Sequence, residues 1–143
     1  MASGQLLRSM MLAVSRNDLV KRALVGNGPT KKVVDRFVAG ETLDDCVRVV
    51  RGLRGAGLLA TVDHLGEHTT TEAQASESTE AYLTLLARLD AERLTGACEV
   101  SVKLTALGLA LPDGRRLAAA NAGRICAAAR AVGVPVVATK IAL

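Results

Sequence analysis

Cys98-Glu-Val-Ser-Val-Lys-Leu-Thr-Ala-Leu-Gly108 places a lysine, Lys103, at the end of a short strand and directly before a turn. Its valines are residues that favour strands. An ammonium is costly to bury without an anionic partner, and α/β folds hold ligands at the carboxyl ends of their strands. Two interpretations therefore stand side by side: Lys103 contacts an anionic ligand, or it caps the strand and points to water.

The sequence on both sides of this segment predicts an alternation of strands and helices. A short apolar run at 58–62 leads into Asp63-His64-Leu65-Gly66-Glu67, which places polar residues at the end of a first strand. The remaining pattern predicts a helix at 72–93, the strand at 99–104, a helix at 117–132 and a strand at 134–139. Strands that alternate with helices of this length predict an α/β fold with a parallel sheet.

Short helices are expected before the first strand. Apolar spacing and break residues predict helices at 6–14, 19–25, 30–38 and 42–54. In the last of these, Thr42 is the expected N-cap, and acidic residues in the first turn suit the helix dipole. The chain is therefore divided into a helical lead-in, 1–57, and an α/β part, 58–143.

Composition excludes several classes of function. The chain has 143 residues, half of them apolar, which is enough for a folded core. It carries one Phe, one Tyr and no Trp, which argues against binding single-stranded nucleic acid by base stacking. Tyr82 is expected on the apolar side of the helix at 72–93. The net charge of +4 is spread among acidic residues, so a solvated surface is favoured over a nucleic-acid interface.

Cysteine and histidine spacing indicates neither a disulfide framework nor a metal site. The three cysteines, Cys46, Cys98 and Cys126, are far apart and odd in number, which fits a reducing cytoplasm. His64 and His68 have a spacing that could bind a metal on a helix, but Gly66 between them favours a turn.

The sequence contains no long apolar run, so we expect neither a membrane-spanning helix nor a signal peptide. We expect a cytoplasmic location, with peripheral contact to the inner face of the membrane as an alternative.

The motifs at 63–67 and 101–108 together resemble proline dehydrogenase of the monofunctional bacterial type, which is related to the dehydrogenase domain of proline utilization A. The resemblance runs from about residue 6 to residue 137. It implies the N-terminal portion of a (β/α)8 barrel. It also implies FAD, the oxidation of L-proline to pyrroline-5-carboxylate, and a quinone as electron acceptor.

The resemblance also implies roles for individual residues. Lys103 matches the lysine that contacts the proline carboxylate, and Glu67 matches a glutamate that pairs with a carboxylate-binding arginine and shields the site. Asp63 lies at the carboxyl end of the strand that precedes Glu67. We expect it to support the residues that contact the substrate without contacting the substrate itself. Residues that bind the cofactor are not assigned, and no metal is implied.

The end of the chain departs from the family pattern. Thr139 stands where the family's third strand has an active-site aspartate, in a Leu-Asp-Met-Glu-Asp type motif. About three of the eight barrel strands are encoded, without the family's paired arginines. We therefore expect a truncated chain that neither binds FAD tightly nor oxidises proline. The alternative is a non-catalytic remnant or a helical or half-barrel interaction module. Open sheet edges would favour its self-association.

Overall fold

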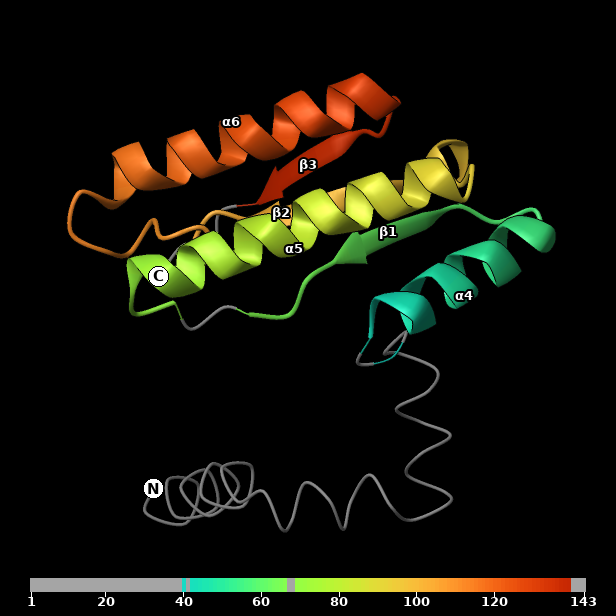
Figure 1. Ribbon diagram of the computed structural model, residues 1–143, viewed down its shortest axis with the longest axis horizontal. Helices are drawn as coiled ribbons and strands as arrows, with labels where there is room; N and C mark the ends of the chain where they lie inside the picture. The colour runs from blue at the N-terminus through green and yellow to red at the C-terminus, as the bar shows by residue number, and fades with distance from the viewer. Residues whose placement is uncertain (1–39, 41, 67–68, 140–143) are drawn as a thin grey trace, which may run out of the picture. The chain divides into compact units, whose positions relative to one another are not determined.

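The computed structural model describes residues 40, 42–66 and 69–139. Its helices and strands all belong to one compact unit, Leu43–Leu143 (Figure 1). The elements follow in the order α4 (Leu43–Gly55), β1 (Ala60–Asp63), α5 (Glu72–Ala91), η1 (Thr95–Ala97), β2 (Cys98–Lys103), α6 (Gly114–Val132) and β3 (Val136–Thr139). The helices expected at 6–14, 19–25 and 30–38 lie outside the described residues, and the division at residues 57 and 58 stays a prediction.

The strands form one parallel sheet in the order β1-β2-β3. In this register Val62 lies beside Val100, and Val100 lies beside Val136. Parallel neighbours require crossover connections, which α5 and α6 supply. The predicted α/β class and parallel sheet are confirmed.

One face of the sheet packs against helices, and the other is more polar. Along β2, Cys98, Val100 and Val102 are buried, whereas the alternating residues are only half-buried. Helices α5 and α6 pack against each other over the buried face and run along the sheet (Figure 1). The core therefore lies between the sheet and these two helices, and α4 adds Val47 and Val50 to it.

The helix boundaries follow from local capping. Thr71 and Gln74 form a capping box at the start of α5, which confirms the predicted beginning at residue 72. The helix ends at Ala91, two residues before the predicted end, because Arg93 adopts a left-handed φ of 56°. Helix α4 spans nearly the predicted range and has Asp44 and Asp45 in its first turn.

The first strand begins later than predicted. Leu58 donates its backbone N–H to Leu53, which closes the end of α4 and delays the extended chain. Leu58 and Leu59 are consequently exposed, and β1 covers only Ala60–Asp63.

Two buried side chains anchor the turn that follows β2. Thr69 donates its hydroxyl to the carbonyl of Ala106 at 3.1 Å. Asn121, on α6, donates its amide to the carbonyl of Leu107 at 3.2 Å. The turn predicted after Lys103 is thus bonded both to the chain before α5 and to α6, which holds the carboxyl end of β2 in place.

Candidate functional site

Asp63 and Lys103 meet at the carboxyl ends of β1 and β2. The Nζ atom of Lys103 lies 2.6 Å from Oδ2 of Asp63. The Lys103 side chain is 18% exposed and that of Asp63 is 28% exposed. Lys103 is therefore held by an anionic partner in a largely sheltered position, and its ammonium does not simply extend into water.

A tyrosine on α5 connects the same two strand ends. The ring of Tyr82 is fully buried. Its hydroxyl accepts the backbone N–H of His64 at 3.1 Å and lies 2.7 Å from the carbonyl oxygen of Ser101. The same hydroxyl lies 3.2 Å from Oδ1 of Asp63. One oxygen atom thus bonds to the backbone at both strand ends and to the carboxylate beside Lys103.

The environment of Tyr82 keeps its hydroxyl protonated. Burial raises the pKa of Tyr82 to about 12, and the negative charge and hydrogen bond of Asp63 act in the same direction. The His64 N–H and the charge of Lys103 oppose this rise, because both stabilise a phenolate. At neutral pH Tyr82 is therefore a hydrogen-bond donor and not a base.

The ring of His64 contacts the ring of Tyr82. The two rings meet edge to face with centroids 5.9 Å apart. Nδ1 of His64 is buried and has no hydrogen-bond partner within the described part of the chain. The imidazole therefore acts here through packing on the Tyr82 ring.

Thr139 lies next to Lys103 at the end of β3. The register pairs the two residues directly. Thr139 is thus adjacent to Lys103 and carries an exposed neutral side chain, while its match to the family's aspartate stays a prediction.

Further polar contacts lie on the same face of the sheet. Thr61 donates its hydroxyl to Oε1 of Glu99 at 2.8 Å. Ser101 lies two positions before the end of β2 and pairs with Asp63 in the register. The face that the helices leave uncovered is therefore polar near the predicted site.

The structure brings together two of the residues singled out from the sequence, Lys103 and Asp63. Glu67 and His68 lie outside the described residues. Sequence reasoning assigned Tyr82 only to the apolar side of its helix and missed its hydroxyl. A usable signal was present, because a tyrosine on a buried helix face must find a partner for its O–H.

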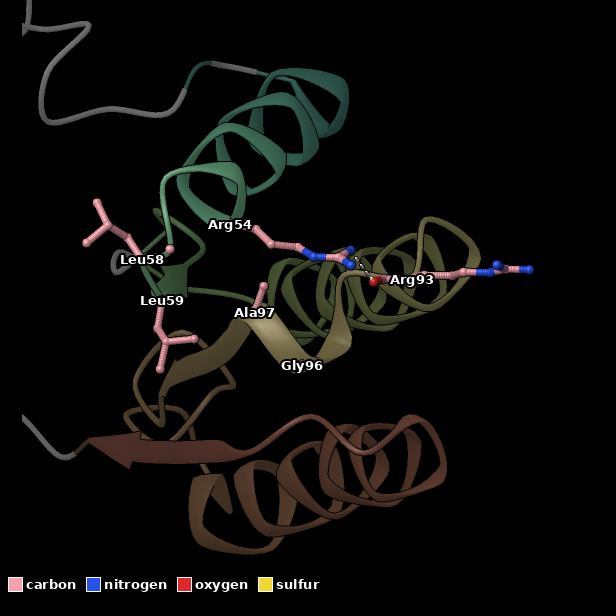
Figure 2. A pocket seen from close by; sticks show the side chains of 7 residues that line it. Arg54, Leu58, Leu59, Arg93, Gly96 and Ala97 are labelled. Carbon is pink, nitrogen blue, oxygen red and sulfur yellow. Dashed lines mark hydrogen bonds between the residues drawn. The ribbon is translucent and has the colours of Figure 1, made fainter.

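A pocket of about 350 Å³ lies at the other end of the sheet. Its walls come from the end of α4 and from the segments just before β1 and β2, as Figure 2 shows. Arg54 points across it and donates to the carbonyl oxygen of Arg93 at 2.8 Å. This pocket belongs to the amino ends of the strands and is separate from the Asp63–Lys103 pair.

The part of the chain that the structure describes holds neither a cluster of metal ligands nor a membrane-spanning helix. Residues 40, 42–66 and 69–139 contain no group of three metal-ligating side chains. Within the same ranges, none of the helices combines the length and apolarity needed to cross a bilayer.

Comparison with known proteins shows clear sequence relatives. Proline dehydrogenase 1 of Bacillus subtilis (strain 168) is 33% identical over 108 residues, which cover 76% of this chain. The chain is related in sequence to proline dehydrogenases. Proline dehydrogenase 2 of the same strain is 28% identical over 102 residues, or 71% of this chain. Proline dehydrogenase of Deinococcus radiodurans is 28% identical over 130 residues, or 90% of this chain. No protein-family model matches the chain.

The similarity covers only part of each relative. The matched residues make up 35%, 33% and 41% of the three proline dehydrogenases, in the same order. The resemblance predicted from the two motifs is confirmed. The chain spans about a third of the length of the curated relatives it matches.

Proposed function

We propose that residues 43–139 form the first β/α units of a proline dehydrogenase barrel, and that Lys103 binds the carboxylate of L-proline. The observation that carries this proposal is the position of the Lys103 ammonium. It lies at the carboxyl end of β2, largely sheltered and 2.6 Å from Asp63. The name of the relatives, proline dehydrogenase, supplies the substrate class.

The chemistry of the pair suits a carboxylate ligand. A lysine ammonium has three donors, so Lys103 can bond to Asp63 and to a ligand carboxylate at the same time. Asp63 supports the cation before the ligand arrives and offsets the cost of sheltering it. It also places a negative charge close to the incoming carboxylate, which limits affinity and favours a zwitterion over a simple anion.

The resemblance also implies FAD and a quinone acceptor. A bound flavin would accept a hydride from proline. The described residues do not form a flavin cradle on their own. Asp63 and Lys103 pair with each other at the carboxyl ends, and the 350 Å³ pocket lies at the opposite end of the sheet. We propose that the 143-residue chain by itself neither retains FAD nor reduces a dye with proline.

Isotope-edited NMR of the full chain tests the carboxylate contact. With ¹³C-labelled lysine, the ε-methylene signal of Lys103 is assigned by its loss in Lys103→Met. We expect this signal to shift saturably when L-proline is added. L-Prolinamide, which lacks the carboxylate, is the matched control ligand and should leave the signal in place. The proposal is wrong if proline leaves the signal unmoved, or if prolinamide moves it equally.

A separate measurement tests the flavin proposal. The full chain is incubated with FAD, desalted and examined for flavin absorbance and for proline-dependent dye reduction. We expect neither. Retention of one flavin per chain, together with proline-dependent reduction, would show that this chain is itself an active enzyme.

A second candidate function is an interaction module. Within the described sheet, β1 and β3 each have a single strand neighbour. Val137 on β3 is 41% exposed, so this edge strand also carries an apolar side chain on the face that the helices leave uncovered. Unpaired strand edges template association with another chain. Light scattering on the purified chain would favour this candidate if a defined oligomer formed. A monomer at high concentration would count against it.

A further inference from the structure

We propose that Tyr82 is a positioning residue for the carboxylate site, because its hydroxyl orients Asp63 and thereby aims the ammonium of Lys103. This inference rests on the proposed function. It concerns a residue on the covering helix, α5, and not on either strand that forms the site.

Three contacts converge on the hydroxyl of Tyr82. It accepts one hydrogen bond, from the backbone of His64, and has a single proton to give. Two acceptors compete for that proton: the Ser101 carbonyl at 2.7 Å and Oδ1 of Asp63 at 3.2 Å. The shorter contact indicates that Ser101 takes the larger share, and Asp63 takes the smaller.

These contacts restrict the carboxylate from both sides. Oδ1 of Asp63 faces Tyr82, while Oδ2 faces Lys103 at 2.6 Å. Because the Tyr82 ring is fully buried, packing holds its hydroxyl in one position. The carboxylate therefore has a fixed plane, and the ammonium that it holds has a fixed direction.

The shared proton also provides a response to the ligand. A carboxylate that binds Lys103 draws the ammonium partly away from Asp63, which leaves Oδ1 and Oδ2 with more unbalanced charge. The Tyr82 proton then shifts its share from Ser101 towards Asp63. No bond other than these hydrogen bonds changes, so the site adapts without moving the backbone.

The composition makes this residue easy to observe. The chain has one tyrosine and no tryptophan, so ultraviolet emission and tyrosinate absorbance report on Tyr82 alone. Binding of L-proline should therefore change the emission of the wild-type chain. L-Prolinamide should not change it.

The decisive comparison is between Tyr82→Phe and Thr79→Val in the full chain. Tyr82→Phe keeps the buried ring and removes the hydroxyl. Thr79 is also fully buried on α5, but its hydroxyl donates to Ala75 within the helix and does not reach the strands. Each variant removes one buried hydroxyl, so thermal unfolding should register a loss of stability in both.

Only Tyr82→Phe should affect the site. We expect it to move the Lys103 ε-methylene signal in the ligand-free chain and to weaken L-proline binding about three- to tenfold, the range for one lost hydrogen bond. Thr79→Val should leave both unchanged. The inference is overturned if Tyr82→Phe and Thr79→Val have the same effect on the Lys103 signal and on the affinity for L-proline.

The proposed function can fail separately. If L-proline does not move the wild-type Lys103 signal, the carboxylate proposal is wrong. The signal of the ligand-free Tyr82→Phe chain then still decides whether Tyr82 positions Lys103. If Tyr82→Phe does not fold, Asp63→Asn replaces it. That variant should lower the pKa of Tyr82 from about 12, as measured by tyrosinate absorbance. An unchanged pKa would show that Tyr82 and Asp63 are not coupled.

Discussion

The ammonium of Lys103 lies 2.6 Å from the carboxylate of Asp63, across the carboxyl ends of two neighbouring strands. Glu80 and Arg124 form a second pair at the same distance, but their side chains are 56% and 49% exposed. The two pairs therefore share an N–O distance but differ in their exposure to solvent. This contrast allows the strength of the sheltered pair to be measured against an internal reference.

We expect a double-mutant cycle with Asp63→Asn and Lys103→Met to give a coupling free energy of about 1 kcal/mol or more. The matched cycle with Glu80→Gln and Arg124→Met should give about 0.5 kcal/mol or less, because exposed pairs are screened. Urea unfolding of the wild type and the three variants in each cycle measures both values. Equal couplings would show that Asp63 and Lys103 behave as an ordinary surface pair.

Alkaline pH should destabilise the fold through Tyr82. Its pKa is about 12 in the folded chain, against about 10 for an unfolded tyrosine, so the folded state holds this proton more tightly. The stabilisation is complete below pH 10 and is lost as the pH rises through 12. Between pH 9 and pH 11.5 the loss from this group is about 2 kcal/mol.

Tyr82→Phe isolates this contribution from the lysines and arginines that titrate in the same range. Denaturant unfolding at both pH values should show a smaller decrease for the variant than for wild type. Absorbance at 295 nm follows the same event, since Tyr82 is the only tyrosine. A midpoint near 10 in the folded chain would contradict the burial of the hydroxyl.

Most of the architecture could be predicted from the sequence because it depends on local patterns. The apolar run of β2 and the start of the long helix at residue 72 are both visible without a structure, and each appears within one residue of its expected place. The start of β1 was less predictable, because Leu58 belongs to the apolar run that predicts a strand. A backbone hydrogen bond to Leu53 holds it in the α4 terminus instead.

The site was only half predictable for a different reason. Parallel strands bring their carboxyl ends together, so Asp63 and Lys103 could be expected on one edge of the sheet. The spacing of residues in the sequence does not show which residue of α5 places a hydroxyl at that edge of the sheet. Tyr82 has the spacing of a core residue, and only the packing of α5 shows that its hydroxyl reaches Ser101.

The cysteines should differ in reactivity according to their burial. Cys126 is exposed, while Cys98 is buried and Cys46 is half-buried. Burial raises the pKa of the Cys46 and Cys98 thiols, which reduces the thiolate available for reaction. With a thiol reagent at pH 8 we expect one fast phase and slower phases separated from it by on the order of tenfold in rate.

Cys126→Ser should remove the fast phase and leave the slow phases unchanged. Denaturant should merge all phases, because it exposes the three thiols equally. A fast phase that survives in Cys126→Ser would mean that Cys46 or Cys98 is more accessible than the structure shows.

Two glycines should respond in opposite ways to alanine. Gly108 ends the segment after β2 with a φ of 97°, and a Cβ there would lie 2.7 Å from the Leu117 side chain. Gly108→Ala should therefore lower the free energy of unfolding by about 2 kcal/mol or more, because it combines backbone strain with overpacking. Gly123 lies in the exposed interior of α6 with no atom within 4 Å of an added Cβ. Gly123→Ala should raise the free energy by about 0.5–1 kcal/mol.

The same pair of variants tests whether the turn after β2 supports the site. Gly108 lies five residues beyond Lys103, in the turn whose carbonyls are held by Thr69 and Asn121. Gly108→Ala should disturb the ε-methylene signal of Lys103 in NMR spectra of the folded chain. Gly123→Ala should leave that signal in place while it raises the melting temperature. If Gly108→Ala lowers stability but leaves the Lys103 signal unchanged, the turn stabilises the fold without setting the position of the ammonium.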